Sequence, residues 1–224
     1  MNKATSLPDN SPRQAWVLAV VAGFSDTVGF LAFGAFAGLM SGNTVLLGIA
    51  LAAGRLTDAL HSMAIISAFL TGIAAATFLS RRAFPLAGFV AVEAAILVIA
   101  ALLPTGVAAP MLGLAMGIQN AMATHFGGLT LNTVFLTGDL QKLIQALIDR
   151  ITRKSELKAG PDHSGIIALL WFCYLSGAAL GAAAHAWLAR PLLLAPLLLL
   201  LVLFRSRRLI RQQSKVSVRK PGCR

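Results

Sequence analysis

Long stretches with almost no charged side chains constrain this chain more than any other feature. A helix that crosses the hydrocarbon core of a bilayer needs about 20 consecutive apolar residues. A helix on the surface of a large soluble domain would carry a polar face, and these stretches have none. We therefore predict an all-α polytopic membrane protein with about six transmembrane helices. The stretches are residues 14–53, 59–80, 84–103, 107–126, 164–189 and 191–204.

The charge of the chain lies mainly outside these stretches. Only 12% of the residues are charged, yet the formal net charge is +11. Much of this excess lies in residues 205–224, directly after the last apolar stretch, where basic clusters typically face the cytoplasm and anionic lipid. No nucleic-acid-binding module is recognisable. We expect the lipid bilayer as a partner, anionic lipid at this basic tail, and no nucleic acid. Residues 1–13 form a polar N-terminal tail.

The chain contains an internal repeat. GFSDTVGFLAFGAFAGLMSGNTVLLGIAL (23–51) aligns with GIQNAMATHFGGLTLNTVFLTGDLQKLIQAL (117–147). Further on, AFLTGIAAA (68–76) aligns with CYLSGAALG (173–181). The polar positions fall in the same order in both copies, which apolar segments alone would not produce. Such self-similarity indicates a duplicated architecture.

We predict one membrane domain made of two homologous halves, about residues 14–106 and 107–204. Each half holds a span, a short segment opened by Ser/Thr-Gly-Asn/Asp, and two more spans. If the short segment does not cross the membrane, each half has three spans and the halves are inverted. If it crosses, the halves are parallel. Cytoplasmic loops are rich in Lys and Arg. The inverted arrangement places Arg81 and Arg82 inside together with both termini, so we favour it.

Two polar breaks, MSGNTVLLG (40–48) and FLTGDLQKL (135–143), are the clearest candidate site. Glycine adopts backbone angles that other residues avoid, and Ser, Thr, Asn and Asp cap helix N-termini. We expect a short broken or re-entrant helix to start at each break and to run to about Ala53 and Arg150. Non-helical backbone at membrane depth lies inside protein or beside a water-filled cavity. The alternative is a pair of ordinary helix caps at the membrane surface.

Polar side chains within the spans complete this candidate site. Asp26 lies in the first span, and its repeat counterpart is Asn120, which follows Gln119. A carboxylate inside a membrane is a functional-site candidate by default. The alternative is a hydrogen bond that locks two helices together. Glu93 has no acidic counterpart in the second half. The predicted substrate-binding residues are Asp26, Ser41, Gly42, Asn43, Gln119, Asn120, Thr137, Gly138 and Asp139.

Glycines also recur at helical spacing, and such faces let helix backbones approach closely in membranes. We favour packing within one chain, and a homodimer is the alternative. These glycines are Gly34, Gly38 and Gly42, then Gly113 and Gly117, then Gly177 and Gly181.

Signatures of catalysis and of metal binding are absent from the sequence. No two histidines have metal-ligand spacing, and Cys173 and Cys223 do not join them. Neither G-x-S-x-G nor H-E-x-x-H occurs. We expect no metal, no cofactor and no enzymatic activity. A Ser41–His185 pair is the enzyme alternative, and no spacing supports it.

Four motifs resemble the YoaK family of uncharacterised bacterial integral membrane proteins. They are GFSDTVGF (23–30), MSGNTVLLG (40–48), MGIQNAM (116–122) and FLTGDLQKL (135–143). The likeness covers most of the chain except its two tails. The family usually has Thr-Gly-Asn at the first break, and Ser41 keeps the hydroxyl here. The resemblance implies a polytopic inner-membrane protein, without an established substrate or reaction.

The leading functional hypothesis is a small-solute transporter or channel of the bacterial inner membrane. Its site would lie between the two halves, with both termini cytoplasmic. Helix N-termini at the breaks would favour an anionic group, whereas Asp26 and Asp139 would favour a cation or a proton. The alternatives are a non-transporting assembly or interaction protein of the membrane and, third, a membrane-embedded enzyme.

Overall fold

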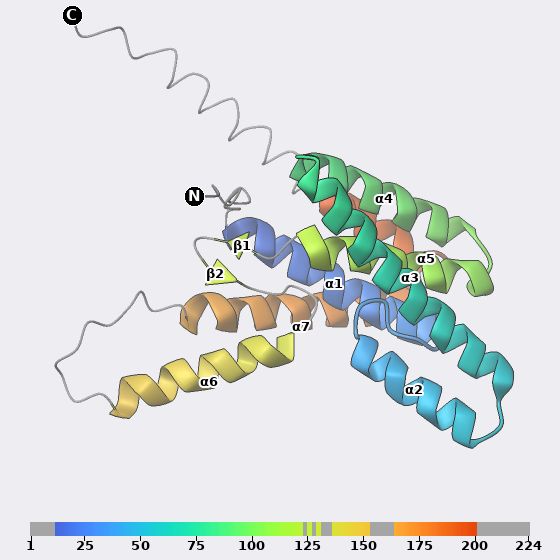
Figure 1. Ribbon diagram of the computed structural model, residues 1–224, viewed down its shortest axis with the longest axis horizontal. Helices are drawn as coiled ribbons and strands as arrows, with labels where there is room; N and C mark the ends of the chain where they lie inside the picture. Colours follow the sequence, from blue (N-terminus) through green and yellow to red (C-terminus); the bar gives the residue numbers. More distant parts are fainter. Residues whose placement is uncertain (1–11, 123–124, 127–128, 131–135, 153–163, 201–224) are drawn as a thin grey trace, which may run out of the picture.

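Seven α-helices and a small hairpin follow one another along the described part of the chain (Figure 1). The computed structural model describes residues 12–122, 125–126, 129–130, 136–152 and 164–200. The predicted basic tail and most of the polar N-terminal tail lie outside these residues. The elements are α1 (Pro12–Phe33), α2 (Met40–Ala52), α3 (Leu56–Arg81), α4 (Leu86–Leu102), α5 (Thr105–Met122), β1 (His125–Phe126), β2 (Leu129–Thr130), α6 (Leu136–Thr152), α7 (Ser164–Trp187) and the 3-10 turn η1 (Pro191–Leu193).

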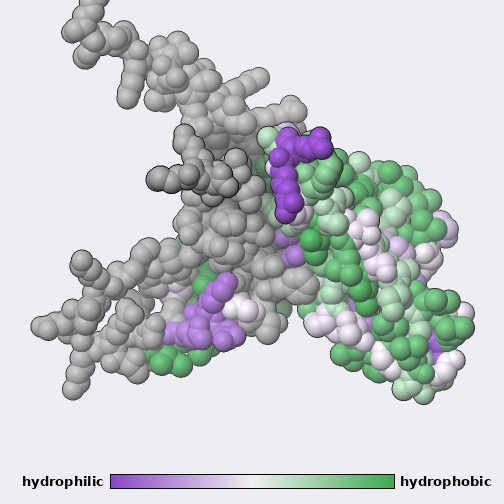
Figure 2. All heavy atoms as spheres, in the orientation of Figure 1, coloured by the Kyte–Doolittle hydropathy of each residue, from purple (hydrophilic) through white to green (hydrophobic). Residues whose placement is uncertain are grey.

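Three of these helices are long and apolar enough to cross a membrane, judged by length and composition within the described residues. They are Gln14–Phe33 of α1, Leu56–Arg81 and Ser164–Trp187. Helices α2, α4 and Pro191–Leu200 are apolar but shorter, and the last four residues of the predicted 191–204 span lie outside the described part. Large apolar side chains such as Phe78 cover much of the outer surface (Figure 2). Such a surface suits contact with lipid.

The predicted 107–126 span ends earlier than expected. Helix α5 stops at Met122, and β1 then pairs antiparallel with β2, with His125 opposite Thr130 and Phe126 opposite Leu129. The sequence between the strands is Gly-Gly, which is typical of two-residue hairpins. The all-α prediction is correct apart from this hairpin.

Helices α1 and α7 pack closely because glycines of α7 face the backbone of α1. A Cβ atom on Gly177 would collide with the carbonyl of Val20, and one on Gly181 would lie 2.8 Å from the carbonyl oxygen of Phe24. The predicted close-packing face is therefore correct here. Since both residue numbers rise together along the contact, the two helices run parallel.

Helices α3 and α5 make a second contact of the same kind. A Cβ atom on Gly113 would lie 2.8 Å from the carbonyl oxygen of Ile65, and one on Gly117 would collide with the carbonyl of Phe69. These two helices also run parallel. In both cases the glycine spacing serves packing within the chain.

Helices α1 and α5 run antiparallel. Near the end of α5, the side-chain amide of Gln119 donates to the carbonyl of Leu18, near the start of α1, at 3.0 Å. At the other end, a Cβ atom on Gly29 would lie 3.0 Å from a methyl group of Leu112. The hydrophobic core lies around these helices; its fully buried members include Leu18, Phe24, Leu97, Leu112, Met116, Leu170 and Leu199.

The prediction that Gly34, Gly38 and Gly42 share one helix face is wrong. Helix α1 ends at Phe33 and α2 begins at Met40, so two of the three glycines lie between helices. Gly34 has a φ angle of 71°, in the left-handed region, with open space around the position of a Cβ. That angle ends α1 and turns the chain back.

Candidate functional site

Asp26 lies at the centre of a buried hydrogen-bond network that joins α1, α7 and the segment before α2. One carboxylate oxygen accepts from the backbone N–H of Gly38 at 2.6 Å and from that of Leu39 at 3.2 Å. The other accepts from the hydroxyl of Tyr174 at 2.6 Å. The residue is 3% exposed. Every acceptor atom of Asp26 is thus used within the protein.

This network places the carboxylate at the N-terminal end of α2. The first amides of a helix lack partners in the helix and carry a partial positive charge. Leu39 occupies the N-cap position of α2 and makes no side-chain cap. Asp26, from another helix, accepts instead from the two backbone amides that directly precede the helix. A carboxyl group of the protein itself therefore already lies beside the start of α2, where an anionic group was expected.

The caps predicted for α2 are wrong. Ser41 and Asn43 lie inside the helix, which begins at Met40. Asn43 is fully buried, and its side chain forms two hydrogen bonds with the backbone of Phe36. Its side-chain oxygen accepts from the Phe36 N–H at 2.9 Å, and its amide donates to the Phe36 carbonyl at 2.7 Å. A side chain that holds the preceding segment is not available as a cap.

The neighbours of Asn43 in the first break have separate roles. A Cβ atom on Gly42 would lie 2.7 Å from a ring carbon of Phe36, so glycine leaves room for that ring. The Phe36 ring in turn stacks on Phe30, with ring centroids 4.7 Å apart. Of Ser41, Gly42 and Asn43, Ser41 is the exposed residue, so its side chain can contact another molecule.

The bond from Gly38 to Asp26 shows that the chain folds back after α1. Asp26 precedes Phe33, the last residue of α1, by about two helical turns. The start of α2 therefore lies beside α1, about two helical turns before the end of α1. The ring of His61, near the start of α3, lies 3.1 Å from the carbonyl oxygen of Phe33. Since α3 begins beside the end of α1, α2 leads from inside the molecule back to that same end (Figure 1).

Gln119 and Asn120 lie in the last turn of α5, near the start of α1. Gln119 is fully buried and joins α5 to α1 through Leu18. The side-chain oxygen of Asn120 is buried and has no hydrogen-bond partner among the described residues. Asn120 aligns with Asp26 in the repeat. Phe69 of the first half aligns with Tyr174 of the second half, so the helix equivalent to α7 offers Asn120 no such hydroxyl. The two copies thus have different polar chemistry.

The second break begins helix α6, as predicted. The helix starts at Leu136, and Gly138 in its first turn is exposed. The side chains of Thr137 and Asp139 lie outside the described part of the structure. Helix α2 packs against α3 and α6 against α7. Both short helices begin toward the middle of the molecule and diverge outward from it (Figure 1).

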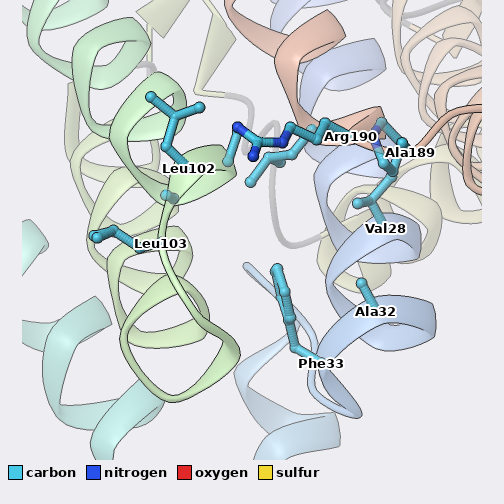
Figure 3. Close-up of a pocket in the computed structure, with 11 residues that line it drawn as sticks. Val28, Ala32, Phe33, Leu102, Leu103, Ala189 and Arg190 are labelled. Carbon is cyan, nitrogen blue, oxygen red and sulfur yellow. The ribbon is translucent and has the colours of Figure 1, made fainter.

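A cavity of about 250 Å³ lies away from all nine predicted site residues. It is formed at the ends of α1, α4 and α7, and Arg190 is its charged group (Figure 3). A guanidinium beside apolar walls can hydrogen-bond a carboxylate or phosphate. The lining residues are Val28, Ala32, Phe33, Ala100, Ala101, Leu102, Leu103, Ala189, Arg190, Pro191 and Leu192. Apolar residues at span ends give no sequence signal for such a cavity.

Sequence reasoning missed Tyr174, which completes the Asp26 network. It is the only tyrosine of the chain. A tyrosine within an apolar helix was a usable sequence signal. Its repeat counterpart, Phe69, is apolar, however, so the repeat gave no reason to pair Tyr174 with Asp26. Within the described residues no group of three or more His, Cys, Asp or Glu side chains could hold a metal ion.

Comparison with known proteins agrees with the resemblance seen in the sequence motifs. The UPF0700 transmembrane protein YoaK of Bacillus subtilis (strain 168) is 29% identical over 183 residues, which cover 75% of this chain and 81% of that protein. No solved structure matches the chain. The model of a family described as "Protein of unknown function (DUF1275)" matches residues 14–205, and the resemblance is thereby confirmed: the chain belongs to the DUF1275 family.

Proposed function

We propose that this protein is a multi-pass protein of the bacterial inner membrane that moves a small solute across it, as a transporter or a channel. The membrane location is supported by the name of its Bacillus relative, a transmembrane protein, and by three apolar helices of spanning length. Both termini are cytoplasmic in this proposal, because the basic C-terminal tail then faces anionic lipid.

The proposed architecture is a pair of inverted three-span repeats. The sequence alignment makes α1 equivalent to α5 and α3 equivalent to α7. Equivalent helices α1 and α5 run antiparallel, as expected for inverted halves, and this supports the proposal. Equivalent contacts also form in both directions between the halves. Gly23 of the first half packs on the carbonyl of Tyr174 in the second, and its counterpart Gly117 packs on the carbonyl of Phe69 in the first. A two-fold relation between the halves accounts for both contacts.

The observation that carries the transport proposal is the arrangement of the two short helices. Inverted repeats with discontinuous helices, whose N-terminal ends meet near the middle of the membrane, are a common design of transporters. Here α2 and α6 both begin toward the middle of the molecule and diverge from it (Figure 1). The fold-back that starts α2 is anchored by Asp26 and Asn43.

The proposed roles of the site residues differ. Asp26, Asn43 and Gln119 hold the walls, because each is hydrogen-bonded to the protein backbone. Their partners are Gly38, Phe36 and Leu18, respectively. Solute contacts are assigned to Ser41 and Asn120 and to the second break around Gly138. No enzymatic role is proposed for the chain.

Thermal-shift screening against a broad panel of small solutes, followed by flux into proteoliposomes, tests this function. We expect one solute class to stabilise the purified protein and to enter liposomes saturably. Ser41→Leu should reduce both effects, whereas Thr44→Val should leave them unchanged. Thr44 is a matched control because it is exposed on the same helix and its hydroxyl bonds only to the carbonyl of Met40.

Two outcomes would contradict parts of this proposal. If the folded protein binds and moves no solute of the panel and instead co-purifies with one protein partner, the assembly role replaces transport. If a solute moves but Ser41→Leu and Thr44→Val behave alike, the site assignment fails and the transport function stands.

A further inference from the structure

Glu93 lies in the core-facing stripe of α4, and no described residue forms a hydrogen bond with it. Its neighbours on that stripe, Val90, Leu97 and Ala100, belong to the main hydrophobic core. Glu93 is fully buried, and both carboxyl oxygens lack a partner among the described residues. A buried polar group in this state is rare in native structures and needs an explanation.

Among the described residues, no charged group compensates for this carboxyl. Helix α5 and η1, which begins the apolar Pro191–Leu200 helix, pack against α4. Neither contains an acidic or basic residue, a histidine, a cysteine or a tyrosine. Helix α3 meets α4 around Phe89, and the nearest charges there, Arg81 and Arg82, are exposed. The guanidinium of Arg82 lies 5.0 Å from the ring of Phe78.

The ionised form of Glu93 is therefore incompatible with this arrangement. An unpaired carboxylate moved from water to an apolar interior is strongly disfavoured, and such a group takes up a proton instead. The described conformation thus holds Glu93 as a neutral carboxylic acid. That proton can leave only if the surroundings change so that water or a donor reaches the carboxyl.

Packing does not require a polar side chain at this place. Glu93 follows Pro85 by eight residues, and Leu199 follows Pro191 by eight in the equivalent segment of the second half. Leu199 is also fully buried and belongs to the hydrophobic core. Leucine fills the equivalent position without an unsatisfied polar group, so the carboxyl of Glu93 serves something other than packing.

We propose that Glu93 is a proton-binding site in the core of the membrane domain, which holds its proton in the described conformation and exchanges it with water in another. The link between this proton and solute movement rests on the proposed transport function. The proton site itself does not.

Infrared spectroscopy of the full-length protein in lipid bilayers tests the proton site directly. At neutral pH the wild type should show the carbonyl stretch of a protonated carboxyl group, and Glu93→Gln should lack it. Asp58→Asn should keep that band, because Asp58 is half-exposed and paired with Arg55 at 3.1 Å. Transfer to deuterium oxide should shift the Glu93 band as its proton exchanges.

Two results would overturn the proton site: absence of the band at neutral pH, or a band that deuterium oxide never shifts. Glu93→Leu should fold as well as the wild type because Leu199 fills the equivalent position, which separates loss of the proton from loss of the fold. If a solute is transported, a proton gradient should drive its uptake in the wild type but not in Glu93→Gln. Absence of all transport would count against the proposed function alone.

Discussion

Asp26 is tolerated inside an apolar helix because three donors from two other parts of the chain reach it. A buried charge is stabilised only when it is paired or fully hydrogen-bonded. Two of these donors are backbone amides of Gly38 and Leu39, and the third is the hydroxyl of Tyr174. The same contacts determine where α2 begins. One side chain therefore fixes the position of a whole helix.

Replacing Tyr174 with phenylalanine should destabilise the protein by about 1.5–3 kcal/mol, the usual contribution of a hydrogen bond to a charged group. The free energy of unfolding in mixed detergent micelles measures this change. Ser176→Ala is the control, because the Ser176 hydroxyl is exposed and bonds to Phe172 of the same helix. The loss in Tyr174→Phe should shrink when Asp26 is already asparagine. Equal effects of Tyr174→Phe and Ser176→Ala would contradict the proposed importance of the network.

At the scale of elements, glycine contacts determine which helices meet. Gly177 lets α7 reach the backbone of α1, and Gly117 lets α5 reach the backbone of α3. The obstacle that a Cβ would meet is a backbone carbonyl in each case, which cannot rotate away. The apolar faces of these helices alone would not select these pairs, because lipid is as apolar as a neighbouring helix.

Gly117→Ala and Gly23→Ala should each destabilise the fold by about 1–3 kcal/mol, the usual cost of overpacking. Similar losses are expected because the two glycines are repeat counterparts that meet equivalent carbonyls. Gly48→Ala is the control: nothing lies within 4 Å of its Cβ position inside α2, so alanine should be neutral or stabilising by up to about 1 kcal/mol. Thermal unfolding in detergent compares the three. Stable Gly117→Ala and Gly23→Ala variants would argue against these close contacts.

For the whole molecule, the direction of the helices supports the proposed inverted topology. The fold-back to Asp26 returns α2 to the end of α1 from which it came, and α3 begins there. In the proposed topology the loop between α2 and α3 lies outside, and the loop between α3 and α4 lies inside. The arrangement in which α2 crosses the membrane would reverse these two positions.

Cysteines introduced at Thr57 and Ser80 test this topology in a background with Cys173 and Cys223 replaced by alanine. A membrane-impermeant thiol reagent should label Thr57→Cys in intact cells with a permeable outer envelope. It should label Ser80→Cys only after the inner membrane is opened. Thr57 suits this purpose better than Gly54, whose φ angle of 67° disfavours any side chain. Labelling of Ser80→Cys in intact cells, with Thr57→Cys protected, would reverse the proposed orientation.

Local sequence patterns predicted much of the fold and only part of the site. The glycine spacings at 113/117 and 177/181 were correct because they lie within continuous helices. The spacing at 34/38/42 was not, because the chain leaves α1 at Phe33. The start of α2 was predicted within a residue or two. The role of Asp26 beside that start was not, since Asp26 belongs to another helix.

The sequence by itself determined the class of this protein, because hydrophobicity, glycine spacing and polar breaks are properties of neighbouring residues. It also determined the family and the places where helices break. Only the tertiary structure decided what the polar residues do. Asp26 and Tyr174 are 148 positions apart in the chain, and Asn43 reaches back to Phe36 instead of capping its own helix. Such partners depend on how helices pack, because a hydrogen bond needs atoms within about 3 Å and residue order does not set that distance.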